Sequence, residues 1–171
     1  MTPDQKMEFV IELAKKAMDS GEFPIAAAIY SGDELIASAF TTENAEGRFL
    51  VHAEQKALME ADLKKLPIKA RRGLELYTNL EPCLMCLGTA ISSFLGKIYY
   101  AVEALDDGAV ELVSKEYARR KQAGTPLQFP FPEVHSGLLR SQSIQLFREF
   151  VNNNEGKPGI AYAKTIAELQ Q

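Results

Sequence analysis

The chain of 171 residues has only two cysteines and two histidines, and it contains no long apolar run. Without such a run we expect no membrane-spanning segment. The first residues also lack the basic-then-apolar layout of a secretory signal, so we expect a cytoplasmic protein. The formal net charge is -4 and the sequence pI is about 5.3. This balance argues against a nucleic-acid partner, because such proteins usually present a basic face.

The length is that of a single domain spanning residues 1–171. Apolar periodicity predicts strands at residues 25–30, 35–40, 74–79 and 97–102. It predicts helices at residues 3–20, 52–65, 82–94, 109–121, 141–151 and 160–169. The first strand is apolar almost throughout, as expected for an interior strand. The alternation of strands and helices indicates an α/β fold with parallel pairing and right-handed crossovers.

The rare residue types are concentrated in two short motifs. Cys83 and Cys86 are the only cysteines, and His52 lies about thirty residues before them. One imidazole and two thiolates suit zinc, and three protein ligands leave the fourth tetrahedral position open, as a catalytic site requires. Both motifs fall at predicted helix starts, where unpaired N–H groups favour thiolates. We therefore predict one Zn²⁺ per chain, bound by His52, Cys83 and Cys86.

Glu54 follows His52 by two residues and places a carboxylate beside the predicted metal. Such a carboxylate can shuttle protons, taking one from water for a ring nitrogen and later protonating a leaving amine. The pattern H-x-E followed by P-C-x-x-C is a known signature of zinc deaminases. We predict that Glu54 is the catalytic residue. His135 is not expected to be a ligand, because a fourth protein ligand would leave Glu54 no water to act on.

Residues 51–54 (VHAE), residues 80–86 (LEPCLMC) and the sequence Phe23-Pro24-Ile25 resemble the cytidine deaminase-like superfamily. The likeness is to the branch of tRNA adenosine deaminases and bacterial guanine and cytosine deaminases, and it extends to residues 137–139 and 147–150. This resemblance implies a three-layer α/β/α sandwich around a five-stranded mixed sheet, usually as a homodimer. It also implies a variable C-terminal helical segment at about residues 141–171, zinc on the three ligands above, and Glu54 as proton shuttle.

The sequence departs from that branch near the expected substrate. Residues 48–51 stand where the branch usually has an Asp-Pro pair, and Thr41 aligns with an asparagine that typically holds the substrate. Asn44 is the alternative to Thr41, and turn formation or capping is the structural alternative for both. Phe23 can stack on a flat base or fill the core. The candidate substrate-binding residues are Phe23, Thr41, Asn44 and Ala53.

The expected substrate is a small amino-heterocycle: a nucleobase, a nucleoside or a related compound. A tRNA deaminase that converts adenosine to inosine is the alternative, but it would be expected to show a basic C-terminal helix, which this chain lacks. Two other functions remain open. The Cys83-x-x-Cys86 pair is compatible with a thioredoxin-like redox site, which would leave His52 and Glu54 unexplained. A zinc-binding module without catalysis would be expected to have lost Glu54.

Overall fold

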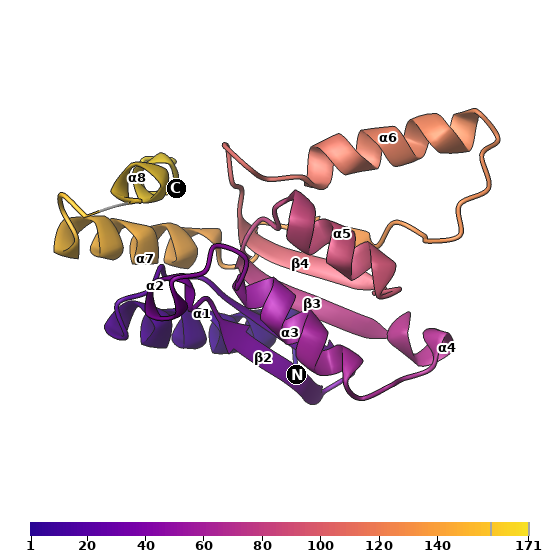
Figure 1. Ribbon diagram of the computed structural model, residues 1–171, viewed down its shortest axis with the longest axis horizontal. Helices are drawn as coiled ribbons and strands as arrows, with labels where there is room; N and C mark the ends of the chain where they lie inside the picture. Colours follow the sequence, from indigo (N-terminus) through magenta and orange to yellow (C-terminus); the bar gives the residue numbers. More distant parts are fainter. Residues whose placement is uncertain (158, 171) are drawn as a thin grey trace.

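The computed structural model describes residues 1–157 and 159–170; Pro158 and Gln171, which fall within the predicted domain and its C-terminal segment, lie outside the described residues. Its centre is a five-stranded sheet with the strand order β2-β1-β3-β4-β5 (Figure 1). β1 pairs antiparallel with β2 and β3, whereas β3, β4 and β5 are mutually parallel. The predicted mixed sheet is confirmed. The strands are β1 (Ala26–Ser31), β2 (Glu34–Phe40), β3 (Leu74–Leu80), β4 (Lys97–Val102) and β5 (Glu133–Ser136).

Helices cover both faces of this sheet. They are α1 (Pro3–Asp19), α2 (Glu43–Glu46), α3 (Ala53–Asp62), α4 (Ile68–Arg71), α5 (Leu84–Ser92), α6 (Val110–Gln122), α7 (Arg140–Asn153) and α8 (Ile160–Ala167). One hydrophobic cluster joins α3, α5 and α6 to one face, and another joins α1 and α7 to the opposite face. Figure 1 shows α3 and α5 side by side in front of the strands, with α1 behind. The predicted three-layer α/β/α sandwich is therefore confirmed.

Local sequence explains where the first helix and the first strand form. Thr2 caps α1 through a capping box with Gln5, and Pro3 occupies the first turn. One face of α1 then buries Met7, Val10, Ile11, Ala14 and Ala17 against the sheet. β1 is buried along almost its whole length because strands flank it on both edges and helices cover both faces. Among the described residues, no helix is both long and apolar enough to cross a membrane.

Several element boundaries differ from the prediction. The helices predicted at 52–65 and 82–94 are α3 and α5, and both are shorter. Lys65 and Phe94, near their predicted ends, have φ values of 52° and 61°, and this left-handed conformation cannot continue a helix. Cys83 is the N-cap of α5 and precedes its first turn. The four-residue helices α2 and α4 lie in segments predicted as connections.

The strand β5 has no counterpart in the strands predicted from periodicity. It is four residues long and lies at the sheet edge, so it carries little of the apolar pattern on which a prediction depends. His135 belongs to this strand, where its ring stacks on Tyr99 at 4.6 Å and its Nε2 lies 2.7 Å from Glu133. The group of potential metal ligands consists of His52, Cys83 and Cys86 and does not include His135.

Candidate active-site pocket

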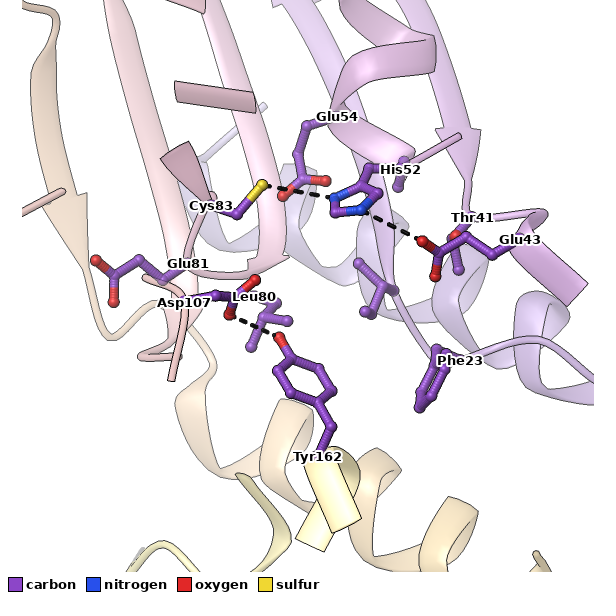
Figure 2. Close-up of a pocket in the computed structure, with 12 residues that line it drawn as sticks. Phe23, Thr41, Glu43, His52, Glu54, Leu80, Glu81, Cys83, Asp107 and Tyr162 are labelled. Atoms are coloured by element: carbon purple, nitrogen blue, oxygen red, sulfur yellow. Dashed lines mark hydrogen bonds and ion pairs between the residues drawn. The ribbon is translucent and has the colours of Figure 1, made fainter. Parts of the chain in front are cut away.

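The two predicted motifs meet at one cavity because two helices begin there. His52 is the N-cap residue of α3, and Cys83 is the N-cap residue of α5, shortly after β3 ends. Figure 2 shows both side chains directed toward a common space, a cavity of about 260 Å³. Unpaired backbone N–H groups and the positive ends of the helix dipoles favour anionic ligands at this point. The predicted placement of both motifs at helix N-termini is thus observed.

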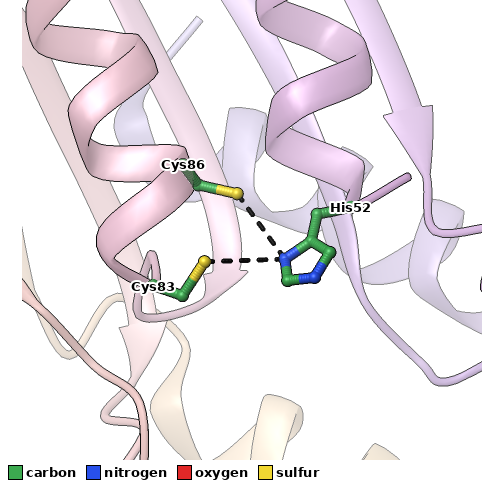
Figure 3. A group of neighbouring side chains, drawn as sticks. All are labelled: His52, Cys83 and Cys86. Atoms are coloured by element: carbon green, nitrogen blue, oxygen red, sulfur yellow. Dashed lines mark hydrogen bonds between the residues drawn. The ribbon is translucent and has the colours of Figure 1, made fainter. Parts of the chain in front are cut away.

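Three side chains form a compact group of potential metal ligands (Figure 3). The Nδ1 atom of His52 lies 3.6 Å from the Sγ atoms of both Cys83 and Cys86. The three ligand atoms all lie within 4.8 Å of one another, and the sulfurs are not bonded to each other. A tetrahedral zinc ion with ordinary bond lengths holds its ligand atoms roughly 3.5 Å apart. The spacing and the chemistry of this donor set therefore fit zinc.

The contacts among Cys83, Cys86 and His52 shift the pKa values of all three side chains. The Cys86 side chain and then His52 stabilise a thiolate on Cys83 and lower its pKa to about 4. The contact with Cys83, followed by that with Glu43, raises the pKa of His52 to about 10. The Cys83 sulfur and burial raise the pKa of Cys86. Because metal ligands must be deprotonated, metal binding here would release protons and would weaken at low pH.

Glu54 lies in the first turn of α3, beside the three ligands, and is 3% exposed. Its Oε1 accepts a hydrogen bond of 3.4 Å from the Thr78 hydroxyl, and its Oε2 lies 3.8 Å from the Cys86 Sγ. Burial raises the pKa of Glu54 to about 7. A carboxyl group with a pKa near neutrality can both accept and donate a proton at physiological pH.

The structure brings most of the candidate substrate-binding residues to this cavity. Phe23, Thr41 and Ala53 line it. The Phe23 ring also packs on Phe150, at a centroid distance of 5.0 Å, so it serves the core and the cavity together. Asn44 is not among the lining residues, because its side-chain amide donates to the Gly21 carbonyl at 2.9 Å.

Besides Glu81 of the cysteine motif, three polar residues that the sequence did not single out also line the cavity: Glu43, Asp107 and Tyr162. The Tyr162 hydroxyl donates to Asp107 Oδ1 at 3.0 Å, and Glu43 Oε1 lies 3.3 Å from His52 Nε2 (Figure 2). They come from three separate elements: α2, the loop between β4 and α6, and α8. Of these three, only Asp107 could have been suspected from the sequence. It lies in the loop after the strand predicted at residues 97–102, and loops at strand ends often carry binding groups.

The loop that carries Asp107 is fastened to the cysteine motif. The Glu81 carboxylate accepts hydrogen bonds from the backbone N–H groups of Ala104, at 3.2 Å, and Val110, at 3.0 Å. Gly108 forms an isolated β-bridge with Cys83, and a Cβ atom on Gly108 would lie only 2.4 Å from Glu81 Oε2. Glycine is therefore required at this position for the close approach that places Asp107 at the cavity.

Comparison with known proteins places this geometry in a family. Residues 1–102 match the family model of the cytidine and deoxycytidylate deaminase zinc-binding region. The tRNA-specific adenosine deaminase of Bacillus subtilis is 39% identical over 101 residues, which is 58% of this chain and 62% of that protein. The protein of the same name in Rickettsia felis is 30% identical over 146 residues, or 84% of this chain and 96% of that protein.

Solved structures give the same result. One, from a study of A-to-I editing by tRNA:A34 deaminases, matches with a TM-score of 0.68 and 26% identity, covering 83% of this chain and 98% of its own. The guanine deaminase of Nitrosomonas europaea matches with a TM-score of 0.66 and 25% identity, covering 87% of this chain and 84% of its own. The chain therefore belongs to the zinc-binding cytidine and deoxycytidylate deaminase family, hydrolases of C–N bonds within the cytidine deaminase-like superfamily.

Proposed function

We propose that this enzyme hydrolyses the amino group of a small heterocycle, such as a nucleobase, a nucleoside or a related compound, to a carbonyl with release of ammonia. One observation carries the choice of a small substrate: the chain's own helix α8 supplies a wall of the cavity. Tyr162 of α8 lines it and bonds to Asp107 across from the His52 and Glu54 side chains. A cavity of about 260 Å³ bounded in this way has the size for a single heterocycle.

In this proposal each residue has a defined role. His52, Cys83 and Cys86 hold one zinc ion per chain, which supplies the Lewis acidity that makes water a nucleophile at neutral pH. Glu54 accepts a proton from the attacking water and delivers it to a ring nitrogen. It then accepts the remaining proton of the newly bound hydroxyl and delivers it to the leaving amine, so that ammonia departs as the carbonyl forms. Phe23 offers an aromatic face to the ring, and Thr41 and Ala53 line the same cavity. Asp107 offers a hydrogen-bond acceptor, and Tyr162 offers a hydroxyl, to the polar edge of the substrate ring.

A second candidate function is deamination of adenosine to inosine in a tRNA. The names of several relatives favour it. The net charge of -4 argues against it, because phosphate contacts normally require a basic surface. A tRNA would also have to insert its base past Tyr162.

Zinc-loaded protein should be tested against a panel of purine, pyrimidine and triazine amines, with ammonia release as the readout. We expect turnover of at least one free base or nucleoside and no salt-dependent binding of tRNA. Inosine formation in tRNA, together with salt-dependent RNA binding and no turnover of any small amine, would establish the second candidate instead. Full zinc content with no ammonia from either substrate class would favour a non-catalytic module.

We also propose that residues 1–171 act as a single deaminase domain whose C-terminal segment completes the cavity, and that the protein is a cytoplasmic homodimer. Exposed apolar side chains support the dimer, because they lie on or directly beside the two helices that begin at the metal motifs: Phe49, Leu50, Met59, Leu63 and Leu84. Sedimentation equilibrium should give twice the chain mass of 18.9 kDa. A monomer at micromolar concentration, or recovery of the protein in a membrane fraction, would contradict these proposals.

A further inference from the structure

The two ring nitrogens of His52 face different partners. Nδ1 faces the two sulfurs at 3.6 Å, and Nε2 faces Glu43 Oε1 at 3.3 Å, just beyond the usual length of a hydrogen bond. A nitrogen that binds a metal must carry no proton, so the neutral ring must carry its proton on the other nitrogen. If Nδ1 binds the metal, the proton is on Nε2, directed at Glu43.

The backbone that carries Glu43 is held in place by a second carboxylate. Glu22 is 1% exposed, and its two oxygens accept hydrogen bonds from the backbone N–H groups of Asn44, at 3.0 Å, and Ala45, at 2.7 Å. The Asn44 side chain ties the same short helix to the Gly21 carbonyl. α2 is thereby fastened to the segment that follows α1. This fixes the position from which Glu43 reaches His52.

The two glutamates of α2, Glu43 and Glu46, have different ion-pair partners. Lys56 and Arg48 both pair with Glu46, at 3.6 Å and 2.9 Å. Glu43 pairs with His52, and its side chain is 21% exposed. A carboxylate held this close to a metal-binding imidazole makes the ring a stronger donor and fixes its orientation.

We propose that Glu43 is a positioning residue that accepts the Nε2 proton of His52 and directs Nδ1 toward the zinc site, with Glu22 holding α2 for this purpose. The proposal rests on the proposed zinc ligation by His52, Cys83 and Cys86. Because Glu43 also lines the cavity, the competing role is a direct contact with substrate. The two roles differ in what they do to zinc affinity.

The test compares Glu43→Gln, Glu43→Ala and the matched control Glu46→Gln on the same helix. The zinc dissociation constant is measured by competition with a chromogenic chelator, and circular dichroism of the metal-free proteins confirms folding. We expect zinc to bind about 10- to 100-fold more weakly to Glu43→Ala, less so to Glu43→Gln, and with unchanged affinity to Glu46→Gln. Glu22→Gln, which loosens α2 without touching His52, should weaken zinc binding by a smaller factor.

A kinetic measurement at saturating zinc completes the test. A positioning role predicts that excess zinc restores most of the kcat of Glu43→Gln, with little change in KM. Wild-type zinc affinity in both Glu43 variants, or a KM that stays raised at saturating zinc, would overturn the proposal in favour of substrate contact. If the wild-type protein binds no zinc, the proposed function itself fails. If the wild type binds zinc but no more tightly than Glu43→Ala, only the positioning role of Glu43 fails.

Discussion

The cavity has two sides built in different ways. The metal side consists of His52, Glu54, Cys83 and Cys86 at the starts of two adjacent helices. The closing side consists of Asp107 and Tyr162 on two separate elements, and Glu43 of α2 contacts the metal side through His52. The metal side matches the zinc-binding region that defines the family, whereas we propose that the closing side sets which molecule can reach it. Family membership therefore identifies the reaction class more readily than the substrate.

The largest effect should follow from removing a ligand on the metal side. Cys86→Ala leaves one sulfur and one imidazole, too few to hold zinc tightly, so both zinc and activity should be lost. Elemental analysis after dialysis and ammonia release measure the two. The matched control is Ser92→Ala, on the same helix and outside the cavity. Full zinc content in the Cys86 variant would contradict the assignment of ligands.

Glu54→Gln should separate catalysis from metal binding. The amide cannot shuttle protons, so kcat should fall by about 10²- to 10⁴-fold while zinc content stays at one per chain. Stopped-time ammonia assays on zinc-loaded protein measure the fall. Activity within a few-fold of wild type would mean that Glu54 is not the proton shuttle.

The metal-free protein gives an independent test of Glu54 through pH. Burial raises the pKa of this carboxyl from 4.5 to about 7, so the folded chain holds a proton that the unfolded chain releases between those values. Stability should therefore fall as pH rises through this window, by about 3 kcal/mol once the group is ionised. Metal-free Glu54→Gln should be the more stable protein above about pH 7, by up to this amount.

Urea unfolding in the presence of a chelator measures this difference across the pH range, with Glu46→Gln as the exposed control. The free energies of unfolding of wild type and Glu54→Gln should converge below pH 4.5, where Glu54 is protonated in both folded and unfolded states. A gap that is constant with pH would show that Glu54 does not titrate in this window.

The smallest effect is expected on the closing side. Tyr162→Phe removes the hydrogen bond to Asp107 and keeps the packing against Phe23. One such bond contributes about 1 kcal/mol, so kcat/KM should fall by up to roughly tenfold with zinc content unchanged. Loss of zinc from this variant would show that the two sides are not independent.

The metal side could be predicted from sequence because its information is local. Cysteine and histidine are rare in this chain, their spacing is short within each motif, and helix starts are marked by apolar periodicity. The three interior strands β1, β3 and β4 were likewise predicted to within one residue of each boundary, because their residues follow the apolar and β-branched or aromatic pattern typical of strands.

The closing side could not be predicted in the same way, because its residues meet only after long-range packing. Tyr162 reaches the cavity because α8 folds back on α7, where Arg148 donates to carbonyl oxygens of Ala167 and Leu169. No spacing of residues in the sequence predicts that α8 packs back on α7. Asn44 is an example of the opposite kind. Its position in the chain favoured a substrate contact, but its side-chain amide donates a hydrogen bond to the backbone carbonyl of Gly21.

The most direct test of the account is X-ray absorption at the zinc edge on the zinc-loaded protein. We predict two sulfur ligands at about 2.3 Å, one imidazole nitrogen at about 2.0–2.1 Å, and a fourth, lighter ligand that exchanges when a substrate analogue is added. Four protein ligands with no exchangeable position, or zinc bound without both sulfurs, would contradict the account.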